Sequence, residues 1–211
     1  MAERTIHHGD GVAWLREQSF GPEHAIVTSL PDVSEVPLGF EAWRAWFVET
    51  AALACSRVAD DAIAIFYQTD IKHEGRWIDK GYLVSRAAES VGAHCVLHRI
   101  ACRSPAGTIT YGRPAYGHLL GFSRSLRLDP KHSTADVMPE IGKMTWVRAM
   151  GTSVCEAVCR LLLTQTQCRV VVDPFCGLGT MLAVANAHGL DAVGVELSRK
   201  RAERARALML P

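Results

Sequence analysis

Apolar residues along the chain gather in runs that alternate between strand length and helix length. Helical spacing of the apolar positions predicts helices at 11–18, 39–58, 77–92, 145–165 and 179–189 and in the arginine-rich tail. Runs rich in β-branched residues predict strands at 24–30, 62–68, 94–102, 117–125, 169–175 and 191–197, and a short apolar start before Gly9 makes a seventh. This alternation is typical of an α/β protein with a mostly parallel seven-stranded sheet covered on both faces.

The strands predicted at 94–102 and 117–125 are an exception to the alternation, because no helix separates them. The connecting stretch RSPAGTITYGRPAY is rich in Gly and Pro. Two strands joined in this way are most simply an antiparallel hairpin. We therefore expect one antiparallel strand in an otherwise parallel sheet.

Composition indicates a single domain over residues 1–211, because 48% hydrophobic residues can bury one sizeable core. The chain has no run of about 18 apolar residues, and MAERTIHHGDG lacks the features of a signal peptide. We expect a cytoplasmic protein that does not bind membranes. The seven cysteines are irregularly spaced and the nine histidines form no HxH or HExxH motif. Neither a disulfide framework nor a metal site is expected.

Charge is distributed unevenly, although the formal net charge is only +1. Residues 99–148 contain eight basic and three acidic side chains, whereas residues 20–62 contain seven acidic and two basic ones. The small net charge argues against extensive electrostatic wrapping of nucleic acid. A local basic region can mark a face for phosphates, or it can be an ordinary solvated surface.

The stretch VVVDPFCGLGT, residues 170–180, carries the clearest chemical signal. An apolar strand ends on Asp173 and leads through Gly177 and Gly179 to a helix near Thr180, while Glu196 ends the next strand. Glycines let the backbone turn sharply beside a ligand, and an acidic residue at the second strand tip is well placed to bind ribose hydroxyls. An adenosine-type cofactor is predicted, although neither GxGxxG nor GxxxxGK[ST] is present.

DPFCGLGT followed by GVELS resembles the DPFxGxGT signature of S-adenosylmethionine-dependent methyltransferases, especially the N4-cytosine and N6-adenine amino-methyltransferases. The resemblance implies a Rossmann-like class I fold and S-adenosylmethionine as cofactor. It places Gly177 and Gly179 against the methionine part, Asp173 or its neighbours near the amino group, and Glu196 on the ribose. The full cofactor set that it implies is Asp10, Thr28, Asp173, Pro174, Phe175, Cys176, Gly177, Gly179, Thr180, Glu196 and Leu197.

The remaining motifs of that family lie upstream of this cofactor segment. IHHGDGVAWL looks like the family segment whose acidic residue, here Asp10, lies near the adenine, and HAIVTSLPD looks like the catalytic strand and loop. The resemblance therefore implies a circularly permuted, beta-type order, with a catalytic and substrate half at 1–130 and a cofactor half at 131–211. Such a shift of the chain break is structurally cheap, because domain termini lie at the surface and often close together.

The catalytic loop departs from the family pattern, which is Asp, Asn or Ser, then Pro-Pro, then an aromatic residue that stacks on a flipped-out base. Here the tetrad is Ser29-Leu30-Pro31-Asp32, with Ser29, Pro31 and Asp32 as catalytic candidates. Stacking can be supplied elsewhere, for which the candidates are Tyr111, Tyr116, Trp77 and Trp146. Alternatively, Asp32 is a base or an anchor for a different nucleophile, or the loop is inactive and the chain only binds cofactor. Asp32 can also simply cap its turn.

Substrate contacts are expected from two loops near the carboxyl ends of the strands. Aromatic and basic side chains there can stack on bases and hold phosphates; the candidates are Gln68, Asp70, Lys72, Arg76, Trp77, Tyr111 and Arg113. Ordinary exposed loops are the alternative. The resemblance also makes Met144 to Arg148 candidate pocket residues beside the cofactor.

Together these features predict a methyltransferase that acts on a nucleobase amino group. RNA, either tRNA or rRNA, is favoured over DNA because no segment is long enough for a separate target-recognition domain, so specificity must come from short loops, a protein partner or a homodimer. Two alternatives stay open: methylation of a small molecule or protein side chain, and a non-catalytic subunit that binds S-adenosylmethionine.

Overall fold

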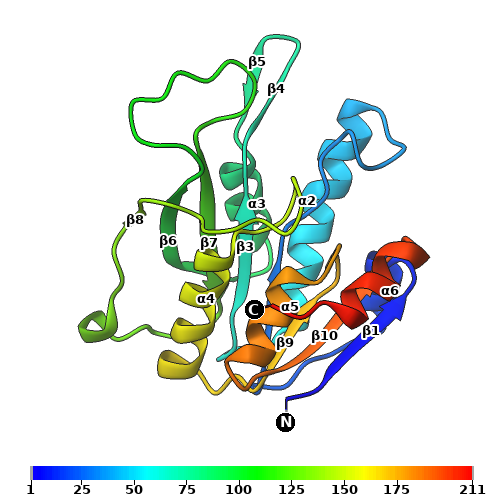
Figure 1. Cartoon of the computed structure of the whole chain (residues 1–211), viewed down its shortest axis with the longest axis vertical. Helices are drawn as coiled ribbons and strands as arrows, with labels where there is room; N and C mark the ends of the chain where they lie inside the picture. Colours follow the sequence, from blue (N-terminus) through cyan, green and yellow to red (C-terminus); the bar gives the residue numbers. More distant parts are fainter. Residues whose placement is uncertain (1, 211) are drawn as a thin grey trace.

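The computed structural model describes residues 2–210 and contains one eight-stranded sheet in the order β1-β10-β9-β2-β3-β7-β6-β8 (Figure 1). All neighbours pair in parallel except at β7, which runs antiparallel to both β3 and β6. The strands are β1 (Arg4–His8), β2 (His24–Thr28), β3 (Ala64–Gln68), β6 (His94–Cys102), β7 (Tyr116–Ser123), β8 (Val137–Met138), β9 (Val170–Asp173) and β10 (Asp191–Glu196). The expected α/β sheet with one antiparallel strand is confirmed. The eighth strand, β8, was not predicted because two residues are too few to form a pattern.

Helices cover both faces of this sheet, and each face has its own core. One core contains buried side chains of α4 and α5, such as Leu162 and Leu182. The other contains Trp43 and Phe47 of α2 with Leu83 of α3. The helices are α1 (Gly11–Arg16), α2 (Phe40–Arg57), α3 (Lys80–Glu89), α4 (Thr152–Gln165), α5 (Thr180–Ala187) and α6 (Arg199–Ala207), with a 3-10 turn, η1 (Pro130–His132). Burial on both faces explains the continuous apolar runs of the central strands.

Two helices begin later than the sequence pattern predicts. The helix expected from residue 145 begins at Thr152, because the backbone N–H groups of Thr152 and Ser153 donate to the carbonyls of Lys143 and Ile141. The stretch 145–151 is thereby left as a turn-rich loop. The helix expected from residue 77 begins at Lys80, after a short hairpin of β4 (Ile71–His73) and β5 (Arg76–Ile78).

The connectivity agrees with a circular permutation. Strand β9, from the last quarter of the chain, lies in the sheet between β10 and β2, and β10 pairs with the first strand, β1. Arg4 of β1 donates hydrogen bonds to the carbonyls of Ala205 and Leu208, at 2.9 and 2.8 Å, so the start of β1 lies against the end of α6 (Figure 1). Strands of both sequence halves therefore belong to one sheet.

All seven cysteines are free thiols, as expected from their spacing. Among residues 2–210, no helix is both long and apolar enough to cross a bilayer.

Candidate active site

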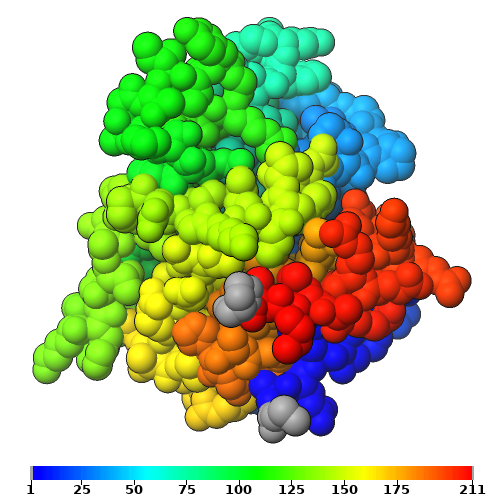
Figure 2. Space-filling model, in the orientation of Figure 1, coloured from blue at the N-terminus to red at the C-terminus, as the bar shows by residue number. Residues whose placement is uncertain are grey.

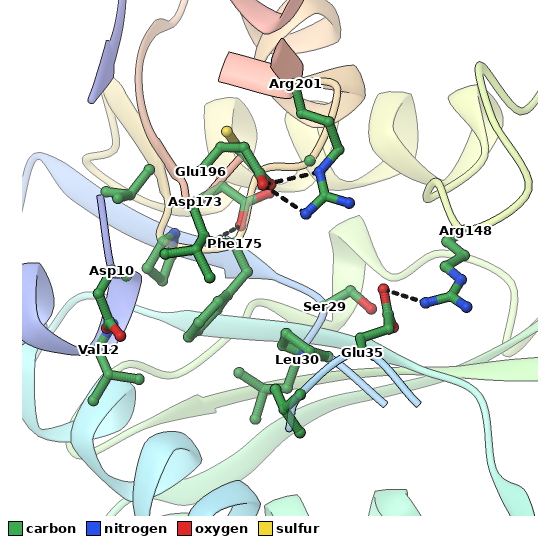
Figure 3. Close-up of a pocket in the computed structure, with 18 of the residues that line it drawn as sticks. Asp10, Val12, Ser29, Leu30, Glu35, Arg148, Asp173, Phe175, Glu196 and Arg201 are labelled. Atoms are coloured by element: carbon green, nitrogen blue, oxygen red, sulfur yellow. Dashed lines mark hydrogen bonds and ion pairs between the residues drawn. The ribbon is translucent and has the colours of Figure 1, made fainter. Parts of the chain in front are cut away.

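A cavity of about 470 Å³ lies at the carboxyl ends of β2, β9 and β10, where the two sequence halves meet (Figure 3). Ser29, Leu30 and Pro31 line one wall, and the loop after β9 lines another. A volume of this size suits a ligand of cofactor or drug size, and the carboxyl ends of parallel strands are where open α/β sheets bind ligands. All of the expected cofactor residues line this cavity except Thr28 and Gly179.

The loop after β9 has the tight geometry expected from its glycines. Gly177 and Gly179 both have left-handed backbone angles, with φ of 56° and 78°. A side chain at Gly177 would also meet the Trp146 ring at 3.3 Å, and one at Gly179 would meet Ala205 at 3.1 Å. Only glycine adopts this backbone without strain in so little space. The loop therefore lets the backbone itself form the wall of the cavity.

Asp173 is a buried carboxylate fixed through one oxygen. Its Oδ1 accepts hydrogen bonds from the Thr28 hydroxyl at 2.7 Å and from the backbone N–H of Phe175 at 3.1 Å. Burial raises the pKa of Asp173 to about 7, and Glu196 nearby acts in the same direction, whereas the two hydrogen bonds oppose the shift. Thr28 therefore does not line the cavity but orients Asp173, which does.

Glu196 is fixed in a similar way. Its Oε1 accepts from the backbone N–H of Ser198 at 2.7 Å and from the Arg201 guanidinium at 2.9 and 2.8 Å (Figure 3). The Arg201 guanidinium also lies over the Trp146 ring, 5.9 Å from its centroid. Within residues 2–210, no donor is found within hydrogen-bonding distance of Glu196 Oε2 or of Asp173 Oδ2. Each carboxylate therefore keeps one oxygen for a ligand.

Asp10 lines the cavity, as expected, but its side chain also caps a helix. Its Oδ1 accepts from the backbone N–H groups of Val12 and Ala13, at 2.8 and 2.9 Å, at the start of α1. The following Gly11 packs against the carbonyl of Pro174 so closely that a β-carbon would overlap it. This contact brings the GDG segment and the DPF segment onto one wall of the cavity.

The two ends of the Ser29-Leu30-Pro31-Asp32 loop have different surroundings. Ser29 lines the cavity, and its hydroxyl makes no hydrogen bond to another part of the described chain. The carbonyl of Pro31 accepts from the indole N–H of Trp43 at 3.0 Å, which fixes the loop to α2. Ser29 is therefore the member of the loop whose polar group is available to a ligand.

Asp32 does not line the cavity and is buried in an ion-pair cluster. One carboxylate oxygen contacts the Lys80 ammonium and the other the Arg113 guanidinium, each at 2.5 Å. Lys80 is itself only 3% exposed, and burial lowers its pKa, while the neighbouring Asp32 opposes that shift. With both oxygens engaged, the geometry favours an anchoring role for Asp32 over a role as base.

The expected substrate residues do not line the cavity. Gln68 was expected on the rim but is fully buried, and no polar group in residues 2–210 bonds its amide. Asp70 is also buried; it accepts hydrogen bonds from the Lys80 backbone N–H at 2.8 Å and the Trp77 indole at 3.3 Å. The other expected residues are exposed on two loops. The β4–β5 hairpin carries Lys72, Arg76 and Trp77, and the segment between β6 and β7 carries Tyr111.

Asp70 also belongs to a cluster that no sequence motif indicates. Asp70, Asp79 and His118 bring potential ligand atoms within 4.8 Å of one another. The His118 ring nitrogen lies 3.2 Å from Asp70, and Asp79 caps α3 through the backbone N–H of Tyr82. These hydrogen bonds account for the arrangement without an ion.

Several cavity residues could not be identified from the sequence. Trp146 and Arg148 lie in the stretch 144–148, which was expected to line the pocket. Arg201 was not expected, because nothing in the sequence distinguishes it from the other arginines of its helix. Glu35 forms an ion pair with Arg148 across the cavity, at 2.7 Å (Figure 3). This pair joins residues 113 positions apart, and no local spacing reveals it.

Comparison with solved structures shows what the fold resembles. A candidate DNA modification methylase of Thermus thermophilus, TTHA0409, solved with S-adenosyl-L-methionine, gives a TM-score of 0.73 at 18% identity, covering 98% of this chain and 94% of that one. The PvuII cytosine-N4-specific DNA methyltransferase gives 0.75 at 12% identity, covering 99% and 87%. The M1.HpyAVI complex with SAM gives 0.65 at 14% identity, covering 97% and 98%. The chain has the Rossmann-like fold of these methyltransferases. Neither a protein-family model nor a curated protein matches the sequence.

Proposed function

We propose that this protein is an S-adenosylmethionine-dependent methyltransferase that modifies an exocyclic amino group of a nucleobase in DNA. One observation carries the proposal. The cavity combines a glycine loop and two half-satisfied carboxylates, Asp173 and Glu196, with a Ser-Leu-Pro loop on the opposite wall. A cofactor subsite and a catalytic loop thereby meet in one pocket.

The residues present fit this cofactor. A ligand with one ammonium group and a ribose needs anionic acceptors, and Asp173 and Glu196 each have an oxygen that no described donor reaches. Gly177 has no side chain to cover the wall beside Trp146, where a β-carbon would be a tight 3.3 Å from the ring, so the backbone can approach the ligand closely. The cofactor would supply an electrophilic methyl group on a cationic sulfonium, for which a pocket with these two carboxylates is favourable.

The chain's own residues would orient the nucleophile. The Ser29 hydroxyl is placed to accept a hydrogen bond from the target amino group, which keeps the nitrogen lone pair directed at the methyl carbon. Pro31 and the Trp43 contact hold the loop rigid. Phe175, Trp146 and Leu30 supply apolar walls that reduce the access of water.

We propose DNA as the substrate, although the sequence alone favoured RNA. RNA was favoured because the chain has no segment long enough for a separate target-recognition domain. The match with this chain covers 94% of TTHA0409, a candidate DNA modification methylase. It covers 87% of the PvuII DNA methyltransferase. The short length of the chain is therefore no argument against DNA.

Transfer of a labelled methyl group from S-adenosylmethionine to genomic DNA from a knockout strain tests the proposal, followed by mass spectrometry of the nucleosides. We expect N4-methylcytosine or N6-methyladenine, and we expect Glu196→Ala to weaken cofactor binding. Label appearing only in tRNA or rRNA would replace DNA by RNA as substrate. Transfer to no nucleic acid would contradict the proposal and favour a small-molecule or protein substrate, or a binding subunit.

A further inference from the structure

The segment between β6 and β7, residues 103–115, forms an arm that exposes apolar side chains. Ile109 is 77% exposed and Tyr111 is 87% exposed. They lie two residues apart in a stretch without helix or strand. Large apolar side chains exposed together on a loop are characteristic of contact sites.

Both ends of this arm are tied to the rim of the catalytic end of the sheet. At its base, the Arg103 backbone N–H donates to the carbonyl of Ala115 at 2.6 Å, and the Arg103 guanidinium lies 3.3 Å from the Thr69 hydroxyl. At its other end, two residues before Ala115, Arg113 forms the ion pair with Asp32. Asp32 directly follows Pro31, which lines the cavity. The ion pair therefore fixes this end of the arm, two residues after Tyr111, to the loop that follows β2.

The charge of the arm suits a polyanion. No acidic residue occurs between Arg103 and Leu128. The β4–β5 hairpin projects from the same end of the molecule, close to the arm (Figures 1 and 2). On this hairpin the Lys72 ammonium lies 5.4 Å from the centroid of the Trp77 ring. A base can reach Tyr111 more freely than Trp77, because Tyr111 is 87% exposed and Trp77 only 46%.

We propose that the arm is a nucleic-acid contact in which Tyr111 stacks on a base and Ile109 inserts beside it. Tyr111 lies outside the cavity, so the contact is with DNA around the target base, and the Asp32–Arg113 ion pair anchors the arm beside the loop that follows β2. Aromatic rings stack on bases of any sequence, and apolar side chains such as isoleucine wedge between base steps. This inference depends on the proposed function, because it names a contact between the arm and the DNA that is methylated.

Fluorescence anisotropy with a labelled DNA duplex that carries one central mismatch tests the proposal. Tyr111→Ala and Ile109→Ala should each weaken binding by at least about fivefold, the lower end of the range for base–aromatic stacking. Tyr111→Phe, which keeps the ring, should bind like the parent. Leu163→Ala, an apolar change at a 42% exposed position on α4, should also have no effect.

Unchanged binding by Tyr111→Ala and Ile109→Ala would overturn the inference, as would a dimer that these changes dissociate while DNA binding stays the same. Methyl transfer by the parent protein separates the two proposals. If the parent methylates DNA and the arm variants match it in binding and rate, only the role of the arm fails. If the parent neither binds nor methylates nucleic acid, the proposed function fails as well.

Discussion

Asp32 and Arg113 lie 81 residues apart in the sequence and form an ion pair that joins the Ser29-Leu30-Pro31-Asp32 loop to the arm. On the other oxygen of Asp32 lies the buried Lys80. Asp32 therefore connects three segments of the chain. A carboxylate with both oxygens paired is a structural anchor. Its two partners differ in burial, so the pair with Lys80 and the pair with Arg113 should contribute differently to stability.

Asp32→Asn should lower the free energy of unfolding strongly, because it leaves the Lys80 ammonium buried without an anionic partner. Removal of one member of a buried ion pair typically costs about 3–5 kcal/mol. Arg113→Gln should cost less than about 1 kcal/mol, since the Arg113 side chain is 42% exposed. Urea denaturation monitored by circular dichroism measures both. Equal losses for the two variants would contradict the assignment of Lys80 as the partner that depends on Asp32.

Gly177→Val should abolish cofactor binding while its matched control, Gly189→Val, retains it. Both glycines have positive φ, 56° and 81°, so both substitutions strain the backbone and should reduce stability to a similar degree. Only the side chain at position 177 meets Trp146 in the cavity, whereas nothing lies within 4 Å of position 189. Isothermal titration calorimetry with S-adenosylmethionine measures the difference. Similar affinities for the two variants would show that the cofactor lies elsewhere.

Asp173 should make both stability and cofactor binding depend on pH. Its folded-state pKa, about 7, lies above its ordinary value of 3.8, so the folded state holds more protons than the unfolded state between these limits. The free energy of unfolding should therefore decrease as the pH rises from about 4 through about 7. Cofactor affinity should change in the opposite sense, because the ionised carboxylate is the better acceptor for an ammonium group.

The variant Asp173→Asn isolates this dependence. Urea titrations from pH 5 to pH 8 should show a smaller slope of stability against pH for the variant than for the parent, and its cofactor affinity should no longer rise through pH 7. Parallel pH profiles for the two proteins would mean that Asp173 is not the titrating group.

The fold and the cavity wall after β9 were predictable because their signals are local. Glu196 could be predicted because it ends an apolar strand. Gly177 and Gly179 could be predicted because they lie in a tight turn, where both have positive φ. The helix start at Thr152 was not predictable, because hydrogen bonds to Ile141 and Lys143 end the preceding loop. The partners of Asp32 lie 48 and 81 residues away. No pattern along the chain reports such contacts, which depend on how the sheet brings its loops together.

If the proposed function is right, Ser29→Ala should reduce the turnover number of methyl transfer and leave cofactor affinity unchanged. The Ser29 hydroxyl is the polar group of the Ser29–Asp32 loop that lines the cavity without a partner in the described chain, so its removal deletes the proposed acceptor for the target amino group. The loss should be at least about tenfold, which corresponds to about 1.4 kcal/mol of transition-state stabilisation. Ser34→Ala, at an exposed position of the same loop, is the matched control. Steady-state kinetics with DNA and S-adenosylmethionine separate the two effects, because a role in binding alone would raise KM without lowering kcat. An unaltered kcat for Ser29→Ala would remove the hydroxyl from the reaction and leave the backbone of the Leu30 to Pro31 segment to orient the nucleophile.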